Sequence, residues 1–195
     1  QGSIAYFRED HFSGGRPLEE PIPLLVDQRT PELVEALFLE ARKPIVVFDA
    51  SDADLLTTRL LTAFWPTIRS EFSVCTYALG PRKIGGRDFD LVFAPKNARS
   101  RFSNWSGRKI EAGSPKSARH RWSSAVAVSI LQSPHPTLAS GDALGLLGAD
   151  GPGDEAAFRK SLLWNELAEK APASSSAVLG MLDIVNSEPC LLYTS

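Results

Sequence analysis

Three carboxylates that could do chemistry stand close together in the sequence, at Asp49, Asp52 and Asp54. Hard cations such as Mg²⁺ bind aspartate oxygens, so the group could serve a nucleotide- or metal-dependent enzyme. It follows an apolar run, where nucleotide sites of α/β folds often lie. The same residues also suit a helix start, with Ser51 as the cap and the aspartates beside the helix dipole. We favour capping, because the segment matches neither a phosphate-binding loop nor an EF-hand.

Other residue types that often carry chemistry are isolated in this chain. His11, His120 and His135 lack the spacing of zinc ligands. Cys75 lies within a strand-like run, which favours a buried and inert thiol. Residues 80–87 (Gly-Pro-Arg-Lys-Ile-Gly-Gly-Arg) could cradle a phosphate, but the ending of a phosphate loop is missing and a solvated turn is favoured. We therefore predict that the chain is not an enzyme and has no catalytic residue, metal or cofactor.

The strongest functional candidate is a basic stretch that contains aromatic residues. Between Arg82 and Trp122 eleven basic residues stand against three acidic ones, a net charge of +8, whereas the rest of the chain carries −10. Arginines mixed with aromatic rings are typical of protein interfaces, and of nucleic-acid surfaces on which bases stack. Alternatively, the rings hold a loop on the sheet while the arginines pair with the acidic remainder. The candidate partner-binding residues are Arg82, Arg87, Arg99, Arg101, Phe102, Trp105 and Arg108.

The elements that must position these residues alternate between helices and strands. Thr30 caps a helix that Pro44 ends, and the β-branched run 45–48 predicts a strand buried on both faces. Further strands are predicted at 72–79 and 89–93, and further helices at 51–65, 122–131, 154–170 and 176–185. This order predicts an α/β (or α+β) fold in which helices flank a small mixed sheet with a hairpin-like pair, followed by a helical C-terminal segment.

Composition predicts how the chain divides. We expect an α/β domain at 1–132, a linker rich in Pro, Gly and Ser at 133–153, and at 154–189 the truncated start of a second, helical domain. Residues 190–195 look like a translated adapter and are expected to be a non-native tail. Cys75 is then the one dependable thiol, which favours a reducing compartment. No apolar run approaches the ~18 residues that span a bilayer, so we expect a cytoplasmic protein without membrane contact.

Four motifs carry a family resemblance: Trp65-Pro66, the segment 72–82, the segment 89–95, and the segment 98–105 with Gly107-Arg108. Together they resemble the N-terminal domain of the bacterial GTPase-associated protein 1 family, over about residues 44–131. The family's usual opening segment is not clearly present in residues 1–20. The resemblance implies a non-catalytic adaptor encoded beside a GTPase in a prokaryotic conflict or defence system.

These observations predict an interaction module that binds an acidic protein partner, such as a GTPase, through the segment from Arg82 to Arg108. Two alternatives stay open. One is a nucleic-acid-binding module that uses the basic aromatic segment 82–122, and its affinity would fall steeply with salt. The other is a nucleotide- or metal-dependent enzyme built on the three aspartates near residue 50.

Overall fold

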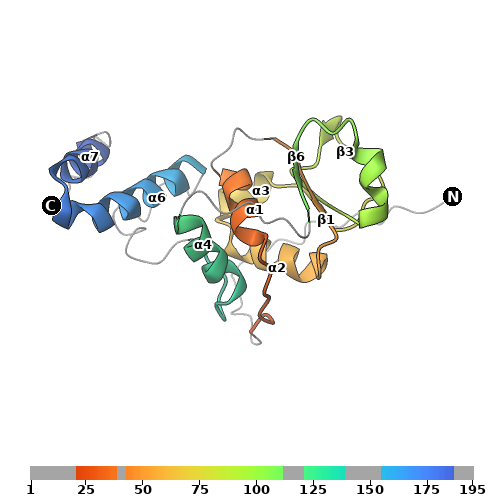
Figure 1. The fold of residues 1–195 in the computed structure, drawn as a ribbon, viewed down its shortest axis with the longest axis horizontal. Helices are drawn as coiled ribbons and strands as arrows, with labels where there is room; N and C mark the ends of the chain where they lie inside the picture. Colours follow the sequence, from red (N-terminus) through yellow and green to blue (C-terminus); the bar gives the residue numbers. More distant parts are fainter. Residues whose placement is uncertain (1–20, 39–42, 112–120, 139–154, 187–195) are drawn as a thin grey trace.

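The computed structural model describes residues 21–38, 43–111, 121–138 and 155–186 of the chain. Within these ranges the fold is α/β, as the alternation of elements predicts: helices cover a small sheet, and further helices follow at the C-terminal side (Figure 1). The first strand lies where the sequence predicts it, and the first helix begins at Thr30. Thr30 does not cap that helix as predicted, because its hydroxyl is buried without a hydrogen-bond partner among the described residues, and the end predicted before Pro44 lies outside them. The boundaries also differ from the sequence patterns around residues 72–93.

The main sheet is wholly parallel. Its strand order is β2-β5-β1-β6, and each neighbouring pair runs in the same direction. β1 and β5 are buried along their whole length, as expected for continuous apolar runs covered on both faces. The strands are β1 (Ile45–Phe48), β2 (Val74–Cys75), β5 (Leu91–Ala94) and β6 (Arg108–Ile110).

Antiparallel pairing is confined to a separate hairpin of β3 (Lys83–Ile84) and β4 (Arg87–Asp88), so the predicted mixed sheet is two separate sheets. The strand predicted at 72–79 shrinks to β2, and it pairs with β5 in parallel. β2 and β5 are parallel because the chain runs back between them, through the hairpin. Gly85 and Gly86 have φ angles of 57° and 84°, which only glycine adopts readily, and they turn the chain within the hairpin before β5 begins.

Helices cover one face of the sheet. They are α1 (Thr30–Phe38), α2 (Ala53–Ala63), α3 (Pro66–Glu71) and α4 (Arg121–Leu131). The cap of α2 is Asp52 rather than the predicted Ser51, because the carboxylate of Asp52 accepts a hydrogen bond from the backbone N–H of Leu55 at 2.8 Å. Trp65-Pro66 ends one helix as predicted, and Pro66 also begins the next, where its missing N–H costs nothing.

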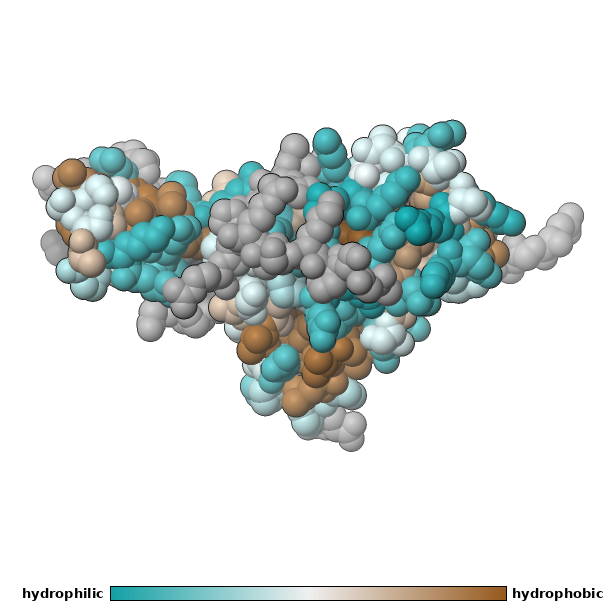
Figure 2. Space-filling view, viewed as in Figure 1, coloured by the Kyte–Doolittle hydropathy of each residue, from teal (hydrophilic) through white to brown (hydrophobic). Residues whose placement is uncertain are grey.

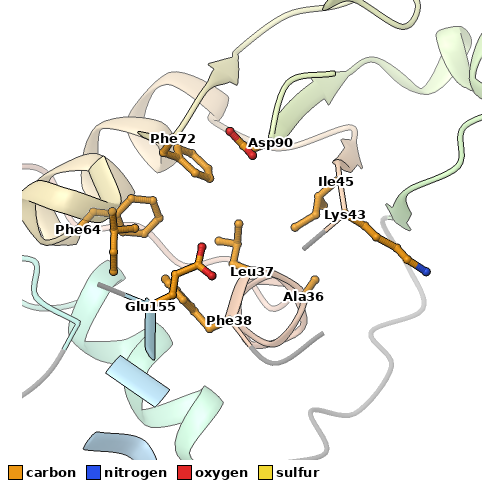
Figure 3. A pocket seen from close by; sticks show the side chains of 10 residues that line it. Ala36, Leu37, Phe38, Lys43, Ile45, Phe64, Phe72, Asp90 and Glu155 are labelled. Atoms are coloured by element: carbon orange, nitrogen blue, oxygen red, sulfur yellow. The ribbon is translucent and has the colours of Figure 1, made fainter. Parts of the chain in front are cut away.

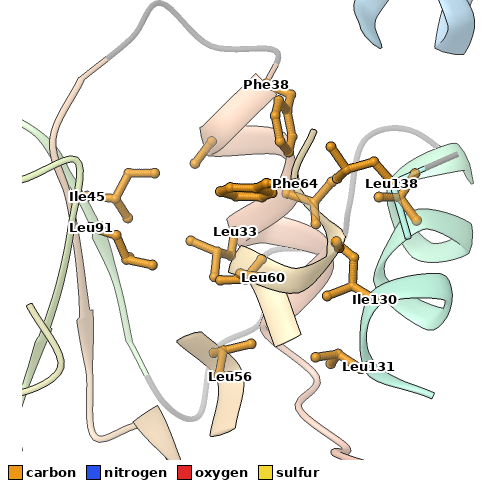
Figure 4. Close-up of a cluster of buried hydrophobic side chains, with 14 of the residues drawn as sticks. Leu33, Phe38, Ile45, Leu56, Leu60, Phe64, Leu91, Ile130, Leu131 and Leu138 are labelled. Carbon is orange, nitrogen blue, oxygen red and sulfur yellow. The ribbon is translucent and has the colours of Figure 1, made fainter. Parts of the chain in front are cut away.

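Two buried clusters hold the layers together. Alternate residues of a strand face opposite sides of the sheet, so Ile45 and Val47 pack with the helices while Val46 and Phe48 face the other way. Figure 4 shows the larger cluster, in which Leu33 and Leu60 lie between Ile45 and Leu91 of the sheet and Ile130 of α4. The smaller cluster is closed by the 3₁₀ helix η1 (Lys96–Phe102) and the residues that follow it.

A buried arginine joins the chain's early residues to this helical layer. Arg59 is fully buried, and its guanidinium donates hydrogen bonds to four backbone carbonyls, those of Ile22, Pro23, Ile130 and Ser133. Burial lowers the pKa of Arg59, because the charged form loses its hydration. The carbonyls replace that hydration. That of Ile130 lies in the last turn of α4, where backbone acceptors lack helical partners, and that of Ser133 follows the end of the helix.

The C-terminal helices are α6 (Glu155–Lys170) and α7 (Ser175–Asn186), joined by η2 (Ala171–Ala173), and Figure 1 shows them extending to one side. The first half of α6 packs into the larger cluster through Phe158, whose ring centroid lies 4.6 Å from Phe38 and 5.7 Å from Trp65. The division of the chain into a domain at 1–132, a linker and a helical segment from residue 154 stays a prediction. In the structure, α6 contributes to the same core as the helices that cover the sheet.

Candidate functional site

Exposed cations gather on the β3–β4 hairpin and on η1. We call this the hairpin–η1 surface, defined by Arg82, Lys83, Arg87, Lys96, Arg99 and Arg101, all of which are exposed. The two elements are neighbours, because a Cβ placed on Gly80, just before the hairpin, would lie 3.8 Å from Cβ of Arg101 in η1. Figure 2 shows hydrophilic residues gathered over this part of the molecule.

Most of these cations lack an acidic neighbour. Arg99 pairs with Glu111 at 2.7 Å; the side chain of Arg99 is largely exposed and that of Glu111 is half-buried. Arg87 donates to the backbone carbonyl of Glu71 at 3.3 Å, which leaves its charge uncompensated. Within the described ranges, the remaining four make no ion pair and no side-chain hydrogen bond: Arg82, Lys83, Lys96 and Arg101. The surface therefore keeps a local excess of positive charge.

Two predicted contact residues, Phe102 and Trp105, belong to the core instead. Phe102 is 0% exposed and Trp105 is 9% exposed, and their rings pack edge to face with centroids 5.6 Å apart. Phe102 also packs against Phe48 of β1. The prediction that these rings contact a partner is therefore corrected. Ala98 and Phe102, at the middle and the end of η1, are buried against the sheet, and Arg99 and Arg101 are exposed.

Arg108 is also removed from the candidate surface. Its Nη2 lies 2.8 Å from Oε1 of Glu32 in α1, with the two side chains 24% and 8% exposed. The close approach of β6 to the chain before β1 depends on Gly107, where an added Cβ would stand 1.7 Å from the carbonyl oxygen of Pro44. Arg108 therefore neutralises an acidic residue of the remainder, as the alternative interpretation of the basic segment expects.

Sequence reasoning missed three exposed apolar residues beside the cations. Tyr77 is 64% exposed, Leu79 is 44% exposed and Ile84 is 50% exposed. The strand predicted at 72–79 did not indicate that Tyr77 and Leu79 would be exposed. The one indication in the sequence is Ala78 between them, a small residue that takes the buried position. Tyr77 and the nearby arginines are residue types that are enriched among interface hot spots, and Leu79 and Ile84 add apolar surface beside them.

The three aspartates near residue 50 are all exposed and follow the capping interpretation. Asp52 caps α2, and Asp54 lies in the first turn of that helix. Asp49 has a φ of 57°, and its backbone is fixed by its own N–H, which donates to Ala94, and by its carbonyl, which accepts from Arg29. Among the residues that the structure describes, no group of three His, Cys, Asp or Glu could hold a metal ion.

The other candidates from the sequence are the three histidines, Cys75 and the segment 80–87, and nothing in the described part of the chain gives them a chemical role. His11 and His120 lie outside the described residues, and His135 is exposed. Cys75 is a half-buried free thiol that donates to the carbonyl of Tyr77 at 3.3 Å. The segment 80–87 forms the solvated hairpin turn that the sequence favours.

A small cavity lies at the end of the sheet where β1 and β5 begin (Figure 3). Its volume is about 20 Å³, room for about one water molecule. Phe38, Phe64 and Phe72 line it, and the carboxylate of Asp90 accepts hydrogen bonds from the N–H and hydroxyl of Ser73. This space is too small for a substrate.

Comparison of the chain with models of protein families, with curated proteins and with solved structures finds no match. The resemblance of residues 44–131 to the GTPase-associated protein 1 family stays a prediction. No helix in the described part of the chain is long and apolar enough to cross a membrane.

Proposed function

We propose that this chain is a non-catalytic interaction module that binds an acidic protein partner through the hairpin–η1 surface. The observation that carries the proposal is the group of exposed, unpaired cations set beside Tyr77, Leu79 and Ile84. Charges of one sign steer an oppositely charged partner and fix its orientation. The apolar side chains supply the water-excluding contacts from which most affinity comes.

The rest of the proposal concerns the partner's identity. A GTPase, encoded beside this chain in a bacterial conflict or defence system and acting in the cytoplasm, is supported by the resemblance of residues 44–131. The contact residues differ from those expected from the sequence. The proposed contact residues still include four of the expected arginines: Arg82, Arg87, Arg99 and Arg101. The buried rings and Arg108 are left out, and three exposed apolar residues are added: Tyr77, Leu79 and Ile84.

A protein partner fits this surface better than a nucleic acid. Binding to single strands combines cations with exposed rings on which bases stack. Here Phe102 and Trp105, the rings interleaved with the arginines, are buried, and among the described residues Tyr77 is the single exposed ring beside the cations. A nucleic acid remains an outcome of the test: a mobility shift of DNA or RNA at low salt, lost steeply as salt rises, would favour it over the acidic protein.

The test is a titration of the purified full chain with the GTPase encoded by its flanking gene. The variant Arg82→Glu/Arg101→Glu should raise the dissociation constant at least tenfold, because both cations are exposed and unpaired. The matched control, Lys43→Glu/Lys170→Glu, makes the same change of charge at exposed positions outside this surface and should stay within about twofold of wild type.

A second variant, Tyr77→Ser, tests the apolar part of the surface. Tyr77 is exposed, so its replacement should leave the urea midpoint near that of the wild type while binding weakens about tenfold. Equal losses in the charge variant and its control would contradict the proposed surface. A flanking GTPase that fails to bind the wild type would contradict the GTPase part of the proposal.

A further inference from the structure

We propose that the acidic partner binds as an extended segment that adds a strand to the free edge of β2. This inference rests on the proposed function and deepens it, because it specifies the shape of the bound segment and the backbone groups that it contacts. Strand addition supplies affinity through main-chain hydrogen bonds and specificity through the side chains on either side.

β2 is one of the two outer strands of the sheet. Residues 73–78 run beside β5: the N–H of Leu91 donates to the carbonyl of Ser73 at 3.1 Å, and the N–H of Ala78 donates to the carbonyl of Phe93 at 2.9 Å. Only Val74 and Cys75 form regular strand: the chain bends at Thr76, and the N–H of Ala78, rather than that of Tyr77, reaches Phe93. The edge therefore offers room for a partner strand of two or three residues, about 7 to 10 Å long.

The register fixes which backbone groups point away from the sheet. Successive residues of a strand direct their N–H and C=O groups to alternate sides, and Ser73 and Cys75 face β5. Val74 consequently directs both of its groups outward, and Thr76 directs its N–H outward, because the carbonyl of the same peptide group, that of Cys75, faces β5. Throughout the described ranges neither residue makes a backbone hydrogen bond on that side. Such a row of open donors and acceptors is a template for another strand.

The surroundings of the edge define the chemistry of the segment. Arg87 reaches the carbonyl of Glu71, immediately before the edge begins. Tyr77 and Leu79 lie exposed at the other end of the edge. A bound strand would therefore meet a cation at one end and apolar side chains at the other, which suits carboxylates followed by an aliphatic or aromatic residue.

Two comparisons favour this edge and this occupant. At the other outer strand, β6, the cations are engaged, because Arg108 pairs with Glu32 and Lys109 donates to the carbonyl of Ser103. A second copy of this chain is a poor occupant of the β2 edge, since edge-to-edge pairing would bring two clusters of arginine and lysine together.

The probe is an acetylated, fluorescent peptide of alternating Glu and Val, added to the full chain at low salt, with an alternating Lys and Val peptide as its control. Only the acidic peptide should bind, and Arg82→Glu/Arg101→Glu should weaken its binding at least tenfold. At saturation, exchange of the amide hydrogens of Val74 and Thr76 with solvent should slow at least tenfold by NMR. The Cys75 amide, already bonded to β5, should change little.

The variant Thr76→Pro removes one outward donor and leaves the bonds to β5 in place, so it should weaken peptide binding several-fold while the urea midpoint changes little. If this variant does not fold, the exchange measurement on the wild type still decides the question. Peptide binding without slower exchange at Val74 and Thr76 would overturn strand addition and leave the surface standing. No binding of the acidic peptide would count against both proposals.

Discussion

Arg108 of β6 and Glu32 of α1 form an ion pair with 2.8 Å between Nη2 and Oε1. The pair joins the basic segment of the chain to its acidic remainder. Part of the contrast between +8 and −10 is therefore neutralised inside the fold, and among the described residues of the basic segment the exposed cations lie on the hairpin–η1 surface.

Replacing one member of this pair should destabilise the fold. Arg108→Met leaves Glu32, which is 8% exposed, without its cation, and we expect a loss of about 2 kcal/mol in the free energy of unfolding. The double variant Arg108→Met/Glu32→Leu should recover part of the loss, because no unpaired charge is then left behind. Urea denaturation measures both.

The matched control is the exposed pair of Arg99 and Glu111. Their side chains are 63% and 37% exposed, so water screens the attraction, and Arg99→Met should cost less than about 0.5 kcal/mol. Similar costs at Arg99 and Arg108 would show that burial does not set the strength of these pairs.

Phe102 should behave as a core residue rather than as a contact residue. Phe102→Ala removes a fully buried ring that packs against Phe48 and Trp105, and should cost about 3 to 4 kcal/mol in unfolding free energy. Phe102→Leu, which keeps most of the volume, should retain partner binding. Loss of binding by a folded Phe102→Leu protein would argue for direct contact.

Gly107 and Gly80 should respond oppositely to an added methyl group. In Gly107→Ala the Cβ would stand 1.7 Å from the backbone oxygen of Pro44, so β1 and β6 must separate, at a cost of more than about 3 kcal/mol. In Gly80→Ala the nearest atom lies at an ordinary 3.8 Å, and stability should stay within about 0.5 kcal/mol of wild type. Thermal denaturation of the two variants compares them directly.

Asp52 should matter to stability and not to metal binding. Asp52→Ala removes the cap of α2 and should cost about 1 kcal/mol. Mg²⁺ with nucleotides should leave the melting temperature of the wild type unchanged. A rise in melting temperature that disappears in Asp52→Ala would instead revive the enzyme alternative.

Local signals in the sequence were sufficient for some elements and not for others. The helix that begins at Thr30 and the strand at 45–48 follow from their apolar patterns, although the hydroxyl of Thr30 makes no cap within the described ranges, and the fold class follows from the alternation of elements. The direction of β2 does not, since it depends on where the chain reverses.

The candidate site divides in the same way. The arginines in the sequence located the surface. Packing between distant segments, however, decides that Phe102 is buried and that Tyr77 is exposed. The pairing of Arg108 with Glu32 likewise joins residues 76 positions apart, which no local pattern indicates.

The packing of Phe158 between Phe38 and Trp65 has a consequence for biosynthesis. During synthesis the sheet and its first helices emerge from the ribosome long before α6 does. Until Phe158 follows, the rings of Phe38 and Trp65 lack their cover, and exposed apolar surface of this kind favours aggregation of a nascent chain. The larger core can therefore close only late in translation, when α6 has emerged.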